Sequence, residues 1–247
     1  MIDLYTAGTP NGWKVSIMLE ELREAGVILP PLEVRTVDLR EEQFSATFTA
    51  INPNQKIPAL VHGDLALMES CAILSYLGET FPTDLLPSNQ DKWRVLQWVY
   101  WQAANLGPVF GNKLSYTRYM DDVDPVEKAH PLERFGKEAR RLLGVFSKQL
   151  SRRPFLCGEQ FTIADIACYP WLRGWKWSKI DVTGHPNVVD WISRVRARPA
   201  VARGLKYGMP EAEVDQWTPE TKARYAQLGA SIAGNDTSGR PDGATGD

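Results

Sequence analysis

The stretch Tyr5-Thr-Ala-Gly-Thr-Pro-Asn-Gly-Trp-Lys-Val15 contains the first strand-to-helix junction that the sequence predicts. The apolar residues 1–5 are typical of a β-strand, and the apolar residues after the stretch recur at helical spacing. Thr9 and Asn11 are short polar residues suited to a helix start. A strand that leads directly into a helix directs backbone N–H groups and the positive dipole end at the sheet edge. The junction is therefore a candidate site for an anion, such as a thiolate.

The next residues extend this junction into a small mixed sheet with helices on it. The first expected elements are a helix over 11–25 that stops at Gly26, a strand over 32–38 and a short irregular helical segment over 40–50. A hairpin follows, which Ile57-Pro58 opens and which turns at Gly63-Asp64 into the strand 65–68. A helix then begins at Glu69-Ser70. The strand–helix–strand order over the first 40 residues predicts that strands one and two are parallel.

Everything after residue 90 has helical spacing, with stripes over 93–104, 132–150 and 187–197 and a weaker one over 219–228. Thr162-Ile-Ala-Asp165 has the form of a capping box, with Asp in place of the usual Glu. We expect an α/β domain over residues 1–81, a linker over 82–90 and an all-helical domain over 91–233. The tail 234–247 has almost nothing to bury, so we expect it to be disordered.

The composition excludes several classes of function. With 28 Lys plus Arg against 30 Asp plus Glu, the formal net charge is −2, which favours neither a nucleic acid nor a membrane as partner. No apolar run approaches the ~18 residues of a membrane span, and the N-terminus does not have the pattern of a secretory signal. The three cysteines form neither a disulfide framework nor a zinc pattern, and the three histidines have no ligand spacing. A cytoplasmic location without a metal fits best.

Four motifs in this order resemble the cytosolic glutathione transferase superfamily over residues 1–205. They are the strand-to-helix junction, Asn52-Pro53 through Ile57-Pro58, Glu69-Ser70, and Thr162 to Asp165. The segment Thr9-Pro10-Asn11-Gly12-x-Lys14 is most similar to the nu class, which is associated with glutathione-dependent disulfide reduction. The resemblance implies a thioredoxin-like βαβαββα domain followed by a helical bundle. It also implies a homodimer, and a cis peptide bond at Ile57-Pro58.

Glutathione carries two carboxylates, an ammonium and a thiol, and the sequence offers a group for each. The backbone of Ile57 can pair with the cysteinyl residue, Glu69 can accept from the ammonium, and Ser70 with its helix N–H groups can hold the γ-glutamyl carboxylate. Lys56 and Arg134 are candidates for the glycyl carboxylate or a second glutathione, although Arg134 can also be read as a solvated helix charge. The resemblance adds Gln43 as a glutathione contact.

Thr9 and Asn11 lie where members of the superfamily place the group that faces the sulfur. A hydroxyl or amide donor together with the helix dipole favours the thiolate over the thiol. No Cys-Pro-x-Cys occurs at the helix start, so the reactive thiol would be that of glutathione itself, and two bound glutathiones could supply both electrons. Thr9 and Asn11 can also be read as turn and capping residues only.

We therefore expect a glutathione-dependent disulfide-bond reductase with weak transferase activity, acting on a small disulfide or electrophile. One alternative is a conventional transferase that conjugates glutathione to electrophiles. The other is a non-catalytic module that keeps the fold for interaction or regulation.

Overall fold

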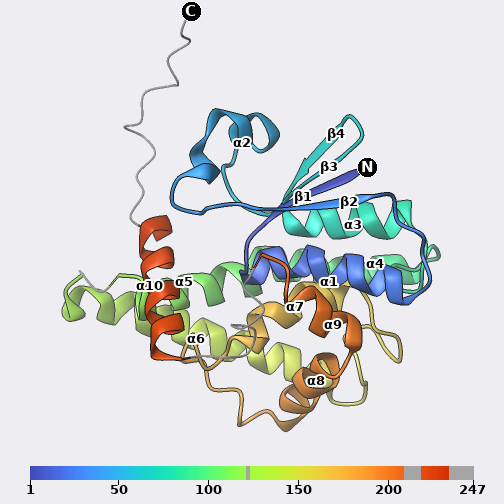
Figure 1. Cartoon of the computed structure of the whole chain (residues 1–247). Coiled ribbons are helices and arrows are strands. Elements are labelled where there is room, and N and C mark those ends of the chain that lie inside the picture. The colour runs from blue at the N-terminus through green and yellow to red at the C-terminus, as the bar shows by residue number, and fades with distance from the viewer. Residues whose placement is uncertain (121–122, 209–217, 234–247) are drawn as a thin grey trace, which may run out of the picture.

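The computed structural model describes residues 1–120, 123–208 and 218–233. Its first part is a four-stranded sheet with helices (Figure 1). The elements are β1 (Ile2–Thr6), α1 (Pro10–Glu24), β2 (Leu32–Thr36), a 3₁₀ turn (Glu42–Phe44), α2 (Ala46–Ile51), β3 (Ala59–His62), β4 (Leu65–Met68) and α3 (Ser70–Thr80). This order confirms the expected thioredoxin-like arrangement.

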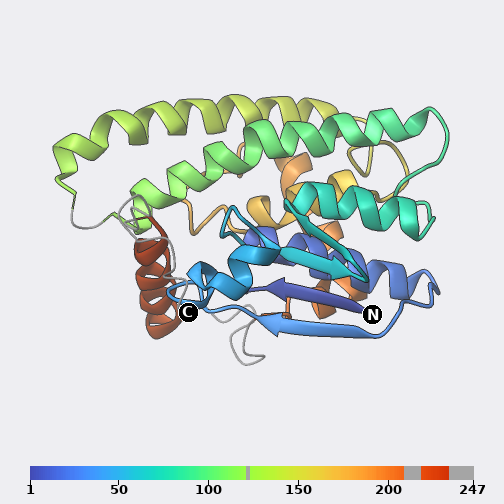
Figure 2. The same cartoon turned by 90° about the horizontal axis from the view of Figure 1, so that it is seen from above.

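The second part of the described chain is helical throughout. Its elements are α4 (Asp91–Trp101), a π-helical segment (Gln102–Leu106), α5 (Gly107–Arg118), α6 (Pro125–Leu150), α7 (Ile163–Arg173), α8 (Pro186–Arg196), α9 (Pro199–Gly204) and α10 (Pro219–Ala233). Viewed from above, α6 runs alongside α5 (Figure 2). None of the helices in the described ranges is long and apolar enough to cross a bilayer. The predicted tail 234–247 lies outside the described residues.

The sheet has the strand order β2-β1-β3-β4. β1 is parallel to β2, as predicted, and antiparallel to β3, which pairs with β4 as the expected hairpin. The expectation that Ile57-Pro58 opens β3 was wrong by two residues. Proline has no N–H for the ladder, and the pairing with β1 begins at Ala59, opposite Tyr5. The Ile57-Pro58 peptide bond is cis.

Helix α1 lies between the sheet and the helical part (Figure 1). It contacts α3, α7 and α9, and every residue from Gly12 to Leu22 is buried. One apolar core therefore continues from β1 through α1 into the helical part. The helix also carries charged residues into this interior, because Lys14, Glu20 and Glu21 are all buried.

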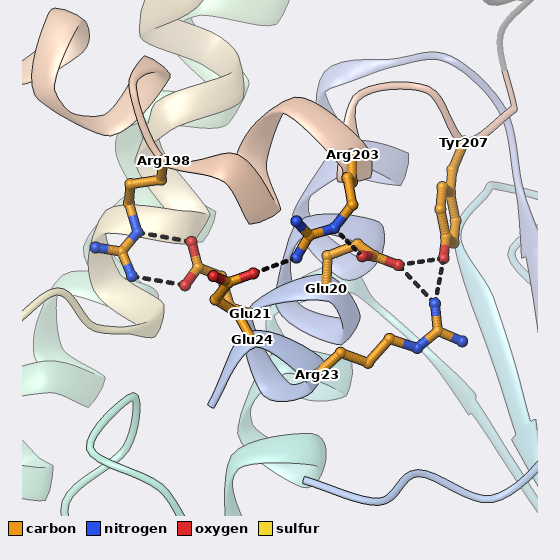
Figure 3. Close-up of polar contacts among 7 residues, drawn as sticks. All are labelled: Glu20, Glu21, Arg23, Glu24, Arg198, Arg203 and Tyr207. Carbon is orange, nitrogen blue, oxygen red and sulfur yellow. Dashed lines mark hydrogen bonds and ion pairs between the residues drawn. The ribbon is translucent and has the colours of Figure 1, made fainter. Parts of the chain in front are cut away.

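Helix α9, which the sequence did not predict, holds the outer side of α1 through a cluster of polar contacts (Figure 3). The cluster consists of Glu20, Glu21, Arg23, Glu24, Arg198, Arg203 and Tyr207. Arg198 donates two hydrogen bonds of 2.6 Å each to the carboxylate of Glu21. Glu20 accepts from Arg203 at 2.7 Å and from the Tyr207 hydroxyl at 2.6 Å. These charge-assisted bonds satisfy the carboxylates that α1 buries.

Candidate functional site

A cavity of about 740 Å³ opens where the end of β1 and the starts of α1 and α3 meet the helical part. On the sheet side its wall includes Gly8, Thr9, Asn11, Lys14, Gln43, Lys56, Ile57, Glu69, Ser70 and Cys71. On the helical side its wall includes Gln102, Gly107, Tyr119, Trp171, Arg173, Trp177 and Tyr225. The structure thus brings together all the predicted site residues except Arg134.

Thr9 is the N-cap of α1, and its side-chain oxygen accepts a hydrogen bond of 3.3 Å from the Gly12 N–H. The hydroxyl hydrogen of Thr9 is not used in that bond and can be donated. The backbone just before the cap is fixed by the segment after α9, because the Gly8 N–H donates to the carbonyl of Gly208 at 2.8 Å. At Gly12, a Cβ would lie 2.3 Å from the carbonyl oxygen of Ala7, so only glycine fits this close approach of helix and strand.

Asn11 is fixed by the helical part. Its Oδ1 accepts a hydrogen bond of 3.2 Å from the indole N–H of Trp171 on α7. Because the indole nitrogen can only donate, this contact assigns the oxygen of the Asn11 amide to Trp171. The Nδ2 group is then the part of the amide that a ligand acceptor can use.

The start of α3 forms a second polar wall of the cavity. Glu69 has φ +67° and precedes the helix, while Ser70 is its first residue and is buried. A non-glycine residue at positive φ costs of order 1–3 kcal/mol, and such strain gathers at ligand sites. This backbone leaves the Glu69 side chain exposed and places the first N–H groups of α3 at the cavity. An anion is the ligand that these groups favour.

Gln43 and Lys56 also lie in the cavity wall, but they differ in solvent exposure. Gln43 is buried, and its side-chain amide donates to the Leu39 carbonyl. Lys56 is exposed. Arg134 lies exposed on α6 and does not line the cavity. The pKa of Glu138 on the same helix is lowered by its hydrogen bond with Arg141, and the charge of Arg134 acts in the same direction. The position of Arg134 in a single chain fits the reading as a solvated helix charge.

Sequence reasoning missed a buried polar cluster beneath α3. Lys14 is buried and donates to Ser70 Oγ at 3.2 Å and to Gln102 Oε1 at 2.6 Å. The Cys71 thiol donates to the same Gln102 oxygen at 3.3 Å. The sequence signals were a lysine between the apolar residues Trp13 and Val15 and its place at the end of the segment that resembles the nu class. Gln102 has no such signal, because its partners are distant in sequence.

The cysteine in this wall is not an activated nucleophile. Cys71 is buried, and burial raises the pKa of its thiol. Burial also raises the pKa of Cys168, which is fully buried. Within the described residues, no group of three or more His, Cys, Asp or Glu side chains is placed to hold a metal ion.

Two family models match this chain. The N-terminal domain of glutathione S-transferase matches residues 2–79, and its C-terminal domain matches residues 112–199. This chain belongs to the glutathione S-transferase family. The disulfide-bond oxidoreductase YfcG of Escherichia coli is 39% identical over 215 residues, which cover 83% of this chain and 94% of YfcG. The disulfide-bond oxidoreductase YghU of the same organism is 37% identical and covers 82% of this chain and 73% of YghU.

Solved structures of the glutathione S-transferase family agree with the fold. A family member from Pseudomonas fluorescens, solved with two glutathione bound, has a TM-score of 0.74 and 38% identity, covering 83% of this chain and 92% of its own. A glutathione transferase from Pseudomonas putida, solved with one glutathione disulfide bound per subunit, has a TM-score of 0.74 and 34% identity, covering 83% and 90%. The fold expected from the sequence, including its helical second part, is confirmed.

Proposed function

We propose that this glutathione S-transferase is a glutathione-dependent disulfide-bond reductase with weak conjugating activity. The observation that carries the proposal is one cavity with two helix N-termini, those of α1 and α3, and no activated cysteine in its wall. Such a wall can bind a ligand that has a carboxylate and a thiol, and can stabilise the thiolate of that ligand. The similarity to YfcG and YghU supports disulfide exchange as the reaction.

In the proposed complex, the γ-glutamyl carboxylate of glutathione lies on Ser70 and the first N–H groups of α3, and Glu69 accepts from the ammonium. The Ile57 backbone pairs with the cysteinyl residue. Thr9 and Asn11 Nδ2 donate to the sulfur at the start of α1, where the helix dipole adds to their effect. Gln43 and Lys56 lie in the same wall and are proposed for the glycyl end, where Lys56 supplies positive charge.

The proposed reaction is two successive thiol–disulfide exchanges. The thiolate of bound glutathione attacks one sulfur of the substrate disulfide, forms a mixed disulfide and releases the other sulfur as a thiolate. A second glutathione thiolate attacks the glutathione sulfur of that mixed disulfide, forms glutathione disulfide and releases the second substrate thiolate. Two glutathiones thus supply both electrons, and relatives that hold two glutathiones or one glutathione disulfide support this stoichiometry.

The proposal is tested with a glutathione-coupled assay on hydroxyethyl disulfide, with chlorodinitrobenzene as the competing electrophile. We expect turnover of the disulfide to exceed that of the electrophile. Faster turnover of chlorodinitrobenzene would favour the conventional conjugating transferase. No turnover above background by a protein that still binds glutathione would overturn the reductase, and failure to bind glutathione-agarose would favour the non-catalytic module.

We also propose that the chain forms a homodimer, as the resemblance implies. Large apolar side chains are exposed on β4 and α4, both of which contact α3. They are Leu65, Met68, Trp93 and Tyr100, of which Trp93 is 68% exposed and Tyr100 is 65% exposed. Burial of such rings against a second copy is the main favourable term for association. A nu-class assignment and a cytoplasmic location stay predictions.

Sedimentation velocity should therefore give about twice the chain mass of 27.8 kDa. The double variant Trp93→Asp/Tyr100→Asp is expected to sediment as a monomer, because it places charges in the proposed interface. Ile28→Asp is the matched control, since Ile28 is 95% exposed but lies in the loop before β2. A wild-type protein that sediments as a monomer at micromolar concentration would contradict the homodimer.

A further inference from the structure

Lys14 is the most unusual charged residue near the cavity. It lies within α1 and only 2% of it is exposed. Burying an ammonium is costly unless it is hydrogen-bonded and paired, and Glu69, whose carboxylate acts on the pKa of Lys14, is itself exposed. A methionine of similar length could fill the same space without this cost. The charge therefore calls for an explanation beyond packing.

The hydrogen bonds of Lys14 fix the direction of its neighbours. Its Nζ donates to Gln102 Oε1 at 2.6 Å and to Ser70 Oγ at 3.2 Å, and lies 4.0 Å from Cys71 Sγ. An ammonium has no acceptor capacity, so the Ser70 oxygen must be the acceptor. The hydroxyl hydrogen of Ser70 must then point away from Lys14, either toward the Cys71 sulfur or toward the cavity. Because Ser70 lines the cavity, that hydrogen can be donated to a ligand there.

Gln102 holds the ammonium in this position from the helical part. It belongs to the π-helical segment between α4 and α5, and such segments occur frequently at functional sites. Its Oε1 accepts from both Lys14 and the Cys71 thiol. Burial lowers the pKa of Lys14, while the nearby Cys71, Cys168 and Glu69 act in the opposite direction. The lysine is thus kept under Ser70 by residues from both parts of the chain.

We propose that Lys14 is a positioning residue for the ligand carboxylate at the start of α3. It orients the Ser70 hydroxyl as an outward donor and places a positive charge beneath the helix N-terminus, so that a carboxylate is favoured there over a neutral group. This inference rests on the proposed function, because it takes the γ-glutamyl carboxylate of glutathione as the occupant. Lys14 belongs to the cavity wall but is almost fully buried, and in this proposal it acts on the carboxylate through the Ser70 hydroxyl and through its charge.

The test measures how Lys14 couples to that one carboxylate. Glutathione is compared by calorimetry with γ-aminobutyryl-cysteinyl-glycine, which differs from it only in lacking the γ-glutamyl carboxylate. We expect the wild-type protein to prefer glutathione by about 10–100-fold, the range for a hydrogen bond to a charged group. In Lys14→Met the preference should fall to less than about 3-fold. The affinity for the analogue should change little, because the analogue has no carboxylate for Lys14 to favour.

A second variant keeps the inference testable if Lys14→Met does not fold. Gln102→Glu keeps the shape and the acceptor oxygen, but its carboxylate neutralises the ammonium and should also reduce the preference for glutathione. Gln97→Glu is the matched control, because Gln97 is exposed on α4 and its side-chain amide donates to the Arg94 carbonyl. It should keep the wild-type preference.

The outcomes separate the two levels of inference. A wild-type protein that binds neither compound overturns the proposed function. If the wild-type protein binds glutathione and Lys14→Met keeps the wild-type preference, only the role of Lys14 is overturned. If Lys14→Met is unfolded, an unchanged preference in Gln102→Glu leads to the same conclusion. Equal loss of both compounds in Lys14→Met assigns the lysine to folding and also overturns that role.

Discussion

Asn11→Ala is expected to lower the turnover of a small disulfide by about 10–100-fold, and to weaken glutathione binding by much less. The amide of Asn11 is fixed by Trp171, so its Nδ2 is the donor proposed for the sulfur. A hydrogen bond to a charged acceptor contributes about 1.5–3 kcal/mol, and this bond forms to the thiolate but not to the thiol. Its loss should therefore raise the apparent pKa of the glutathione thiol in the pH profile of kcat/KM.

Asn11→Asp is the sharper variant for this donor. Aspartate keeps the oxygen that accepts from Trp171, but replaces the Nδ2 group by a second oxygen that cannot donate when ionised. The loss of rate should equal or exceed that of Asn11→Ala. Asn89→Ala, an exposed site before α4, serves as the control for a general asparagine effect. If rate and binding fell equally in both Asn11 variants, the residue would be a ground-state contact and not a thiolate stabiliser.

Asp165→Ala is expected to lower the free energy of unfolding by about 3–5 kcal/mol, the range for disrupting a fully buried hydrogen-bond network. Four donors face the carboxylate of Asp165, which is fully buried on α7. They are the Leu156 N–H at 3.0 Å, the Thr162 N–H at 3.1 Å, the Thr162 hydroxyl at 3.2 Å and the Trp191 indole N–H at 2.9 Å. Urea unfolding measures the loss. Asp181→Ala, which removes an exposed turn carboxylate that accepts from Thr183, should cost less than about 1 kcal/mol.

The contribution of Asp165 to the free energy of unfolding changes with pH in a defined direction. Burial raises the pKa of Asp165 to about 6, against the four donors, and the unfolded chain has a value of about 3.9. The folded protein therefore binds this proton more tightly than the unfolded one, and the associated stability is full below pH ~4 and lost as pH rises through about 6. Relative to Asp165→Asn, the wild type should gain roughly 2–3 kcal/mol between pH 7 and 4. A relative loss over that range would mean that the donors keep the folded-state pKa below the unfolded value.

The parts of the fold that local patterns specify were predicted from the sequence. The Thr9 cap, the hairpin turn at Gly63 and the capping function of Asp165 each depend on residues within a few positions of one another. α1 begins at Pro10, one position before its expected start, and α3 begins at Ser70, within its expected start. Short-range chemistry was sufficient for these elements, whereas anion binding at the two helix starts stays a prediction.

The sequence could not reveal features that depend on long-range contacts. Lys14 and Gln102 are 88 positions apart, and nothing in either segment indicates the other. α9 is six residues long, and its role depends on Glu20 and Glu21 far upstream. Arg134 was predicted from its residue type, but its position on α6 is set by the packing of that helix. Local pattern thus predicted the elements, and tertiary contacts determined which polar groups meet.

The cluster between α1 and α9 limits how this enzyme can be recombined with its relatives. A chimera that kept its first 81 residues would bring Glu20 and Glu21 against a foreign helical domain, and would leave them buried unless that domain offered arginines at the places of Arg203 and Arg198. The carbonyl of Gly208, in the turn after α9, also accepts from the Gly8 N–H, one residue before the cap of α1. A workable crossover therefore has to exchange α1 and the segment 198–208 together, so that the inherited unit is discontinuous in sequence.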